Sequence, residues 1–172
     1  MRFPSPLFRL AGHLRRHGPP ALVAGLGGAL AIGLLAGLSA RLGQALLIAP
    51  FGASAVLVFA LPESPLAQPR NVIGGHLLSA GVGVAVFALL GSGPVACALG
   101  VGLAIALMRL TGTLHPPAGG DPLVVLLGGG AGWSFLLAPV LTGAVALVVI
   151  ARLYHRQFAR LAEGAAIRKP AD

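Results

Sequence analysis

Long stretches without any charged side chain divide the sequence. Four intervals contain no Asp, Glu, Lys or Arg at all, namely residues 17–40, 42–62, 71–108 and 122–151. A membrane helix needs about 20 mostly apolar residues to cross a hydrocarbon core of about 30 Å. Because every interval reaches that length, the pattern predicts several helices that span a membrane.

Within these intervals six apolar segments can be marked: Pro20–Ala40, Leu42–Leu61, Val72–Leu90, Pro94–Met108, Pro116–Gly130 and Ser134–Ala151. Proline and glycine interrupt the second segment at Pro50-Phe51-Gly52 and the fifth at residues 116–120, which would break any helix passing through them. Pro139 in the sixth segment is tolerable in a membrane helix. We therefore expect an all-α integral membrane protein with four full spans and two broken or re-entrant segments.

The order of these segments indicates an internal repeat. Gly18-Pro19 opens the first span and Gly93-Pro94 opens the fourth, and each is followed by a broken segment and a further span. Three segments in each half place the halves in opposite orientations if every segment crosses. That is the inverted 3+3 plan of many transporters, whose discontinuous helices meet near the midplane.

Composition supports the membrane class and locates the charge. Only 9% of residues are charged, against roughly 25% in a soluble domain. The net charge of +8 lies mainly before the first span and after the last, where the positive-inside rule places it, so nucleic acid is not needed to explain it. We divide the chain into a basic N-terminal segment (1–19), a membrane domain (20–151) and a basic tail (152–172).

Arginine placement leaves two topologies open. With six crossings and both termini inside, Arg41 is the only one of the 12 basic residues outside. With re-entrant segments, Arg70 and Arg109 also move outside, and the rule is still obeyed. We expect both termini in the cytoplasm and the chain in a bacterial inner membrane. The first apolar run is too long for a signal-peptide core, so we expect it to be retained.

The two broken segments are the best candidates for a binding site. The N-terminus of a half-helix exposes unpaired N–H groups and a positive dipole end, which suit an anion. Gly52-Ala53-Ser54 and Gly119-Gly120 can each start such a half-helix, with Ser54 and Asp121 as N-caps. Since Asp121 would repel an anion, it could instead bind a proton or a cation.

Further polar residues lie at the edges of the spans. His76 and His115 are ligand or proton contacts, or else histidines satisfied by backbone carbonyls. Arg70 could hold an anion or anchor to headgroups, and Asn71 could cap a helix or bind the ligand. The histidines lack the usual spacing of metal ligands, so we expect no metal site.

Three stretches resemble the HPP family of integral membrane proteins. They are residues 49–57 (APFGASAVL), residues 65–76 (PLAQPRNVIGGH) and His115-Pro116-Pro117-Ala118-Gly119, the motif that names the family. The resemblance implies a transport role, since plant chloroplast relatives are implicated in moving nitrite.

The sequence thus favours a transporter or channel for a small anion such as nitrite. We find no nucleophile elbow, paired carboxylates or phosphate loop, and expect no enzyme activity and no cofactor. The expected partners are the bilayer, a small inorganic anion and a second copy of the chain, but no nucleic acid.

Alternatives to a transporter are a structural or regulatory subunit and, less favoured, a membrane enzyme using the histidines. A transporter predicts a common polar cavity, whereas a structural subunit predicts dry packing. The candidate substrate-binding residues are Pro50, Gly52, Ser54, Arg70, Asn71, His76, His115, Pro116, Pro117, Gly119 and Asp121.

Overall fold

The computed structural model describes residues 6–167, and this part of the chain consists of helices and loops. The α-helices are α1 (Pro6–Leu42), α2 (Pro50–Ala60), α3 (Pro69–Leu90), α4 (Pro94–Thr111), α5 (Asp121–Leu127) and α6 (Thr142–Ile167). Short turns of tighter or wider helix lie between them: η1 (Pro65–Ala67), η2 (Pro116–Gly120), η3 (Trp133–Leu136) and η4 (Leu137–Leu141).

Four stretches of helix in this part of the chain are long and apolar enough to cross a membrane. They are His17–Leu42, Pro69–Leu90, Pro94–Thr111 and Trp133–Phe158. Helix α2 has 11 residues and α5 has 7, too few for the roughly 20 that a full crossing needs. The predicted membrane class is therefore confirmed, and these helices are consistent with four spans and two short broken segments.

Proline sets where most elements begin. Pro50, Pro65, Pro69, Pro94 and Pro116 are each the first residue of their element. Proline suits this position because its ring presets the helical φ and its missing N–H would have no partner in the first turn. The two breaks expected from the sequence are thus the starting points of α2 and η2.

Two segment boundaries differ from expectation. Helix α1 runs straight through Pro19 and Pro20 and begins at Pro6, well before the predicted start. The sixth segment is irregular up to Pro139, and regular helix begins only at Thr142. Ala138 has extended backbone (φ −138°, ψ 122°), which the proline ring imposes on the residue before it.

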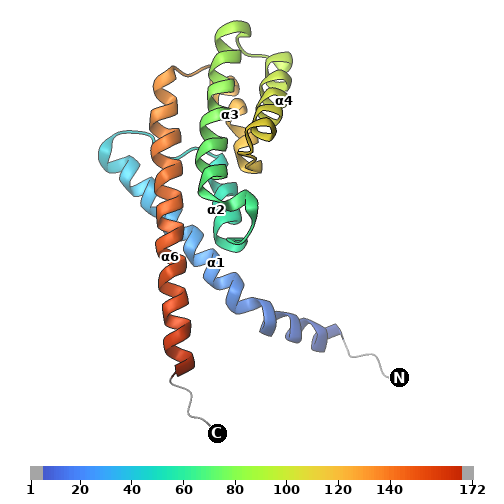
Figure 1. Cartoon of the computed structure of the whole chain (residues 1–172), viewed down its shortest axis with the longest axis vertical. Helices are drawn as coiled ribbons and strands as arrows, with labels where there is room; N and C mark the ends of the chain where they lie inside the picture. The colour runs from blue at the N-terminus through green and yellow to red at the C-terminus, as the bar shows by residue number, and fades with distance from the viewer. Residues whose placement is uncertain (1–5, 168–172) are drawn as a thin grey trace.

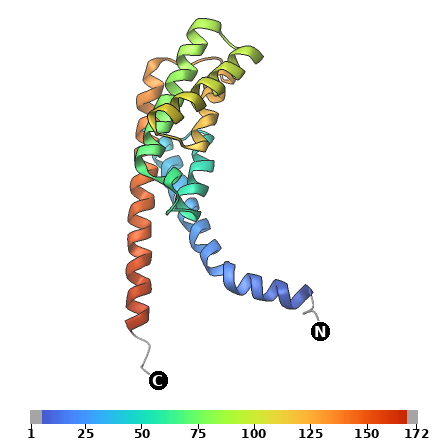
Figure 2. The same cartoon turned by 45° about the vertical axis from the view of Figure 1, so that its right-hand side comes forward.

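Successive segments run in alternating directions (Figure 1). The first described turns of α1 and the last of α6 lie at the same end of the molecule, as Figure 2 also shows. The halves α1–α3 and α4–α6 each place a short helix between longer ones, an arrangement consistent with the predicted inverted repeat. Arg70 and Arg109 lie at the ends of α3 and α4 that point the same way as the chain termini (Figure 1).

The main apolar core joins α1, α2, α3 and α6. Phe51, Leu35, Val72 and Leu147 from these four helices are buried together. Helix α3 packs also against α4 and α5, so it is the central element of the fold. The Tyr154 hydroxyl donates to the Val23 carbonyl over 2.7 Å, so this tyrosine ties α6 to α1.

Only some of the glycines in the spans lie at close helix contacts. A Cβ placed on Gly25, Gly28, Gly33 or Gly37 would meet nothing within 4 Å, although all four lie in the first span. Gly27 is the close-packed position there, because a Cβ would overlap the rings of Phe59 and Tyr154. In α3, a Cβ on Gly83 would lie 2.8 Å from Cα of Pro122, so this glycine lets α5 approach.

Candidate functional site

The two broken segments meet directly. A Cβ on Gly120, in η2, would lie 3.3 Å from Cγ of Pro50 at the start of α2. The first N–H groups of α2 are already paired, because Phe51 donates to the Ile48 carbonyl and Gly52 to the Ala49 carbonyl. The junction therefore forms as the inverted plan predicts, but the leading amides of α2 are not left open for a ligand.

Four polar side chains gather at this junction. Ser54 on α2, His76 on α3, His115 just before η2 and Asp121 at the start of α5 are all fully buried. Ser54 Oγ lies 2.8 Å from Nε2 of His76 and 2.9 Å from Nε2 of His115. His76 Nδ1 lies 2.8 Å from Oδ2 of Asp121. We call these four residues the polar cluster.

The far end of the polar cluster is held by backbone. His115 Nδ1 lies 2.8 Å from the Leu66 carbonyl in η1, which can only accept. Ser54 Oγ is also 3.3 Å from the Pro50 carbonyl, one helical turn earlier in α2. The cluster thus runs without interruption from η1, through the junction, to the first residue of α5.

Further contacts hold the segment around η2 against α3. Asn71 Nδ2 donates to the Leu114 carbonyl over 2.8 Å, and the buried Ser79 hydroxyl donates to the Ala118 carbonyl over 2.6 Å. Gly75 makes the approach possible, since a Cβ there would lie 2.8 Å from Cβ of His115. Asn71 thus pairs the Leu114 carbonyl, and Ser79 is a second donor to the Ala118 carbonyl, which also accepts from the Asp121 N–H.

Predicted roles change in three places. Ser54 is the fifth residue of α2 and makes no cap, and Asp121 bonds His76 rather than its own helix. Asn71 lies within α3 and does not cap it. His76 is seven residues after Pro69, about 10 Å or two turns into α3, because that helix begins before Val72.

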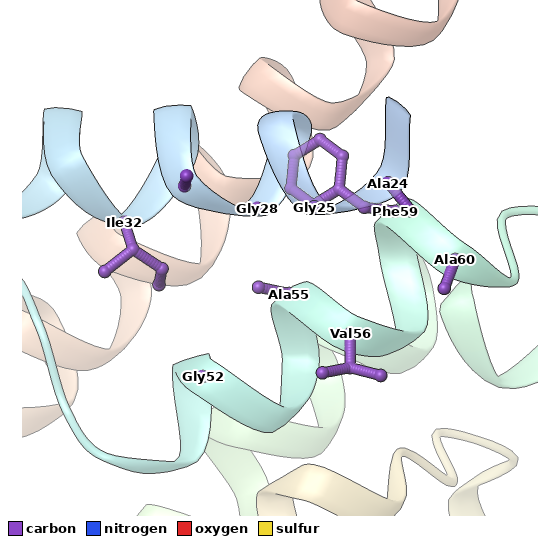
Figure 3. Close-up of a pocket in the computed structure, with 10 residues that line it drawn as sticks. Ala24, Gly25, Gly28, Ile32, Gly52, Ala55, Val56, Phe59 and Ala60 are labelled. Carbon is purple, nitrogen blue, oxygen red and sulfur yellow. The ribbon is translucent and has the colours of Figure 1, made fainter. Parts of the chain in front are cut away.

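Other candidate residues lie outside the polar cluster. Arg70 and Pro116 are exposed, and Pro117 and Gly119 are partly buried. Arg70 lies near the loop after α4, with its Nη2 3.7 Å from where a Cβ on Gly112 would be. Gly52 is exposed and lines a different surface, the apolar groove between α1 and α2 (Figure 3). The structure therefore brings together Pro50, Ser54, His76, His115 and Asp121, with Asn71 beside them.

Of the cavities near the junction, one over Pro50 and Gly120 is lined by apolar residues, and two others differ in character. The groove of Figure 3, about 380 Å³, is lined by alanine, glycine and other apolar residues, so it offers no polar group to a solute. A second pocket of about 430 Å³ lies between η1 and α6 and includes Glu63, Arg152, His155 and Arg156. Since Ala67 and Gln68 line it and Leu66 bonds His115, the segment 66–68 separates this basic pocket from the polar cluster.

The expected common polar cavity is not what the structure shows at the junction. Ser54, His76, His115 and Asp121 have no solvent-exposed surface and contact one another. The backbone groups freed by the two breaks are paired by neighbouring side chains, as with Ala118 and Leu114. The described residues contain no group of three or more His, Cys, Asp or Glu side chains arranged to hold a metal ion.

Comparison with known proteins identifies the family of this chain. Residues 15–162 match the family model described as HPP, transmembrane region. The chain belongs to the HPP family. The HPP match includes all four full spans and both broken segments, so the polar cluster lies within the region that defines the family.

Similar proteins extend beyond this chain. A transmembrane protein of Dictyostelium discoideum is 46% identical over 121 residues, covering 66% of this chain and 42% of that protein. A second from the same organism is 40% identical over 121 residues, covering 66% of this chain and 39% of that protein. The chain thus spans about two fifths of the length of these curated relatives. No solved structure matches it.

Sequence reasoning missed three contributors to the site. Gly75, Ser79 and the Leu66 carbonyl all help to fix the segment around His115. A signal existed for Ser79, which follows His76 by three residues and so shares its helix face. The adjacent Gly74-Gly75 pair indicates close approach of another backbone, but the sequence does not say which one.

Proposed function

We propose that this membrane protein transports a small solute, an inorganic anion such as nitrite, through the junction of its broken segments. One observation carries the proposal: four polar side chains from separate segments are fully buried together in a chain that is 9% charged. Ionisable groups at membrane depth are costly and mark solute pathways or proton relays. A purely structural junction could be built from apolar side chains.

The surroundings of the junction favour an anion. Arg152 and Arg156 are exposed on the pocket beside η1, and Arg70 is exposed at the start of α3. These cations would attract an anion to that side of the polar cluster. Asp121 opposes an anion at the cluster itself unless the carboxyl group carries a proton or its charge is balanced by an imidazolium.

The closed packing sets a condition on transport. Because the cluster is fully buried, a solute reaches it only if α2 and η2 move apart. Relative motion of two halves around a central site is how inverted-repeat transporters work. A non-transporting subunit would keep this junction closed at all times.

A second candidate function, hydrolysis, rests on the order in which three side chains contact one another. Ser54 Oγ, His76 Nε2, His76 Nδ1 and Asp121 Oδ2 follow one another as in a Ser-His-Asp catalytic triad. Against hydrolysis, Ser54 lies inside a regular helix, is fully buried and shares its hydroxyl with a second histidine. We propose that the chain is not an enzyme, and expect no labelling of Ser54 by a fluorophosphonate probe in folded protein; labelling lost in Ser54→Ala would establish the hydrolase instead.

The test of transport is uptake of nitrite by liposomes containing the purified full chain. We expect uptake above protein-free liposomes, and its loss in His115→Ala while Ser79→Ala retains it. Each variant is first checked for insertion and for a cooperative unfolding transition that lies above the assay temperature. Absence of uptake by folded wild type, with and without a proton gradient, would refute nitrite as the solute.

The remaining assignments follow from this proposal. We propose that the chain lies in a bacterial inner membrane with both termini in the cytoplasm. Basic segments precede the first span and follow the last, and the positive-inside rule assigns such segments to the cytoplasmic side. The partners are then the bilayer and the solute, and a homo-oligomer is compatible with the open apolar groove between α1 and α2.

A further inference from the structure

The polar cluster is a single chain of hydrogen-bonding atoms. From the Leu66 carbonyl it passes through both ring nitrogens of His115, the hydroxyl of Ser54 and both ring nitrogens of His76 to Oδ2 of Asp121. The four contacts measure between 2.8 and 2.9 Å, so each is short enough to need a hydrogen atom between its two partners.

Counting hydrogens shows that the ordinary protonation states do not suffice. Two neutral imidazoles supply one N–H each, the serine supplies one O–H, and an ionised carboxylate supplies none. Three hydrogens cannot fill four contacts. The geometry therefore requires one additional proton, and with it the net charge of the four side chains is zero.

We propose that the polar cluster binds one transferable proton, and that this proton is the coupling ion for the transport proposed above. The proposal rests on that function for the coupling, but proton binding itself follows from the contacts alone. It assigns Asp121, His76, Ser54 and His115 a shared role that no single one of them could fill.

The additional proton has three positions that keep all four contacts. With Asp121 as the acid, its O–H donates to His76 Nδ1, His76 Nε2–H donates to Ser54, and Ser54 donates to His115 Nε2. Transfer of the acid proton to Nδ1 leaves a carboxylate and a His76 imidazolium. If His76 then gives its Nε2 proton to Ser54 as Ser54 gives its own to His115, the imidazolium moves to His115. No atom other than hydrogen moves, and the net charge stays zero.

A second observation supports an Asp121 carboxyl group that gains and loses a proton. Oδ1 of Asp121 is buried and has no hydrogen-bond partner, although Oδ2 is bonded to His76. A carboxylate oxygen buried without a partner is costly, and an atom of this kind is expected where a proton or solute comes and goes.

Loss of the proton would weaken the junction. With three hydrogens, one of the four contacts has no hydrogen between its two partners, whichever tautomers the histidines adopt. One of the contacts that join η1, α2, α3 and α5 through the polar cluster is then lost. Release of the proton therefore favours the opening on which transport depends, and rebinding favours closure.

Other charged groups on the surrounding elements face elsewhere. Glu63 precedes η1, Arg70 begins α3 and Arg109 ends α4, and all three are exposed. On α6, Arg152 and Arg156 are exposed, and His155 is bonded through Nε2 to the Val58 carbonyl of α2. The cluster thus titrates as a unit of Asp121, His76 and His115.

Proton binding is tested first without any solute. The full chain in lipid nanodiscs, labelled with ¹⁵N-histidine, is compared in mildly acidic and alkaline buffer by NMR, and proton release is measured with a pH indicator. We expect wild type to release about one proton per chain more than Asp121→Asn, with His76 and His115 changing together. Asp121→Asn should abolish this step, since an amide can donate to His76 Nδ1 but has no proton to give up.

Two further variants keep the result interpretable. Asp121→Glu should restore the release step, which a merely structural role for the carboxyl would not require. Ser92→Ala removes the 2.7 Å hydrogen bond from Ser92 to the Leu126 carbonyl, which lies outside the chain of contacts, so its release should match wild type. Release that is unchanged in Asp121→Asn, or separate changes at the two histidines, would overturn the proposal.

Coupling is tested by nitrite uptake into liposomes with and without an inward proton gradient. We expect accumulation driven by the gradient in wild type and its loss in Asp121→Asn. Uptake that ignores the gradient would refute coupling while leaving transport intact. Proton release in a protein that takes up no nitrite would refute nitrite transport while leaving the proton site intact.

Discussion

At the scale of single residues, each histidine of the cluster uses both ring nitrogens. His115 joins Leu66 to Ser54, and His76 joins Ser54 to Asp121. A histidine with both nitrogens bonded has its ring orientation and its tautomers set by its partners. Replacing either ring by a side chain with one polar atom therefore breaks the cluster, even when the volume is conserved.

Gly75 is predicted to be intolerant of any side chain. In Gly75→Ala the new Cβ would lie 2.8 Å from Cβ of His115 and 2.9 Å from the Thr113 carbonyl. We expect a loss of about 1–3 kcal/mol in stability, the usual cost of overpacking. Thermal unfolding in detergent measures it. Gly33→Ala is the matched control, because a Cβ there meets nothing within 4 Å; equal effects of the two variants would contradict the packing role.

Ser79 is predicted to matter for stability alone. In Ser79→Ala the Ala118 carbonyl loses its 2.6 Å partner inside the protein, at a cost of about 1 kcal/mol. Chemical unfolding should show this decrease, while proton release stays at the wild-type level. A variant that unfolds normally but no longer releases its proton would place Ser79 in the relay.

At the scale of elements, short helices begin where proline and glycine interrupt the apolar pattern. Helix α2 follows a loop and starts at Pro50, and α5 follows the tight turns of η2. Each is shorter than the roughly 20 residues of a full span, and each is followed by irregular chain. Asn71 and Ser79 of α3 donate to the Leu114 and Ala118 carbonyls beside η2, while His76 of α3 joins Ser54 to Asp121.

The contact between the two broken segments can be tested with adjacent glycines. In Gly120→Val the side chain would press on Pro50, since even a Cβ lies 3.3 Å from its Cγ. We expect α2 and η2 to separate, with a lower unfolding temperature and disturbed NMR signals from His115. Gly119→Val is the control, because nothing lies within 4 Å of a Cβ there. Larger damage from the change at position 119 would show that the segments do not meet as described.

At the scale of the whole molecule, the alternating directions of the segments place the two basic ends together. The start of α1 and the end of α6 lie at one end, and the turn between α3 and α4 lies at the other (Figure 1). The start of α3 and the end of α4, where Arg70 and Arg109 lie, point the same way as these ends. It agrees with the topology in which Arg41 alone lies on the opposite side.

Labelling from one side of the membrane tests this arrangement. In a Cys97→Ser background, cysteine is placed at the exposed positions His13, Ser92 or Gln157. An impermeant maleimide should label positions 13 and 157 from one side and position 92 from the other. If position 92 is labelled from the same side as the ends, α2 and α5 re-enter and the segments do not alternate across the bilayer.

The sequence by itself determined the class of the protein, because stretches of about 20 residues without charge have one stable environment. It also determined where helices break, since proline acts on its own backbone and its immediate neighbour. The resemblance carried by His115-Pro116-Pro117 and the preceding motif correctly indicated the HPP family.

Only the tertiary structure decided which polar residues act together. Ser54 and His115 are 61 positions apart, and nothing local in either segment specifies that both meet His76. Arg70 and Gly52 have the right chemistry and the right neighbours in sequence, yet they face away from the cluster. Which side chains meet across segments depends on how the helices rotate and pack. The packing depends in turn on contacts such as Gly75 with His115 and Gly83 with Pro122, which form only when the whole chain folds.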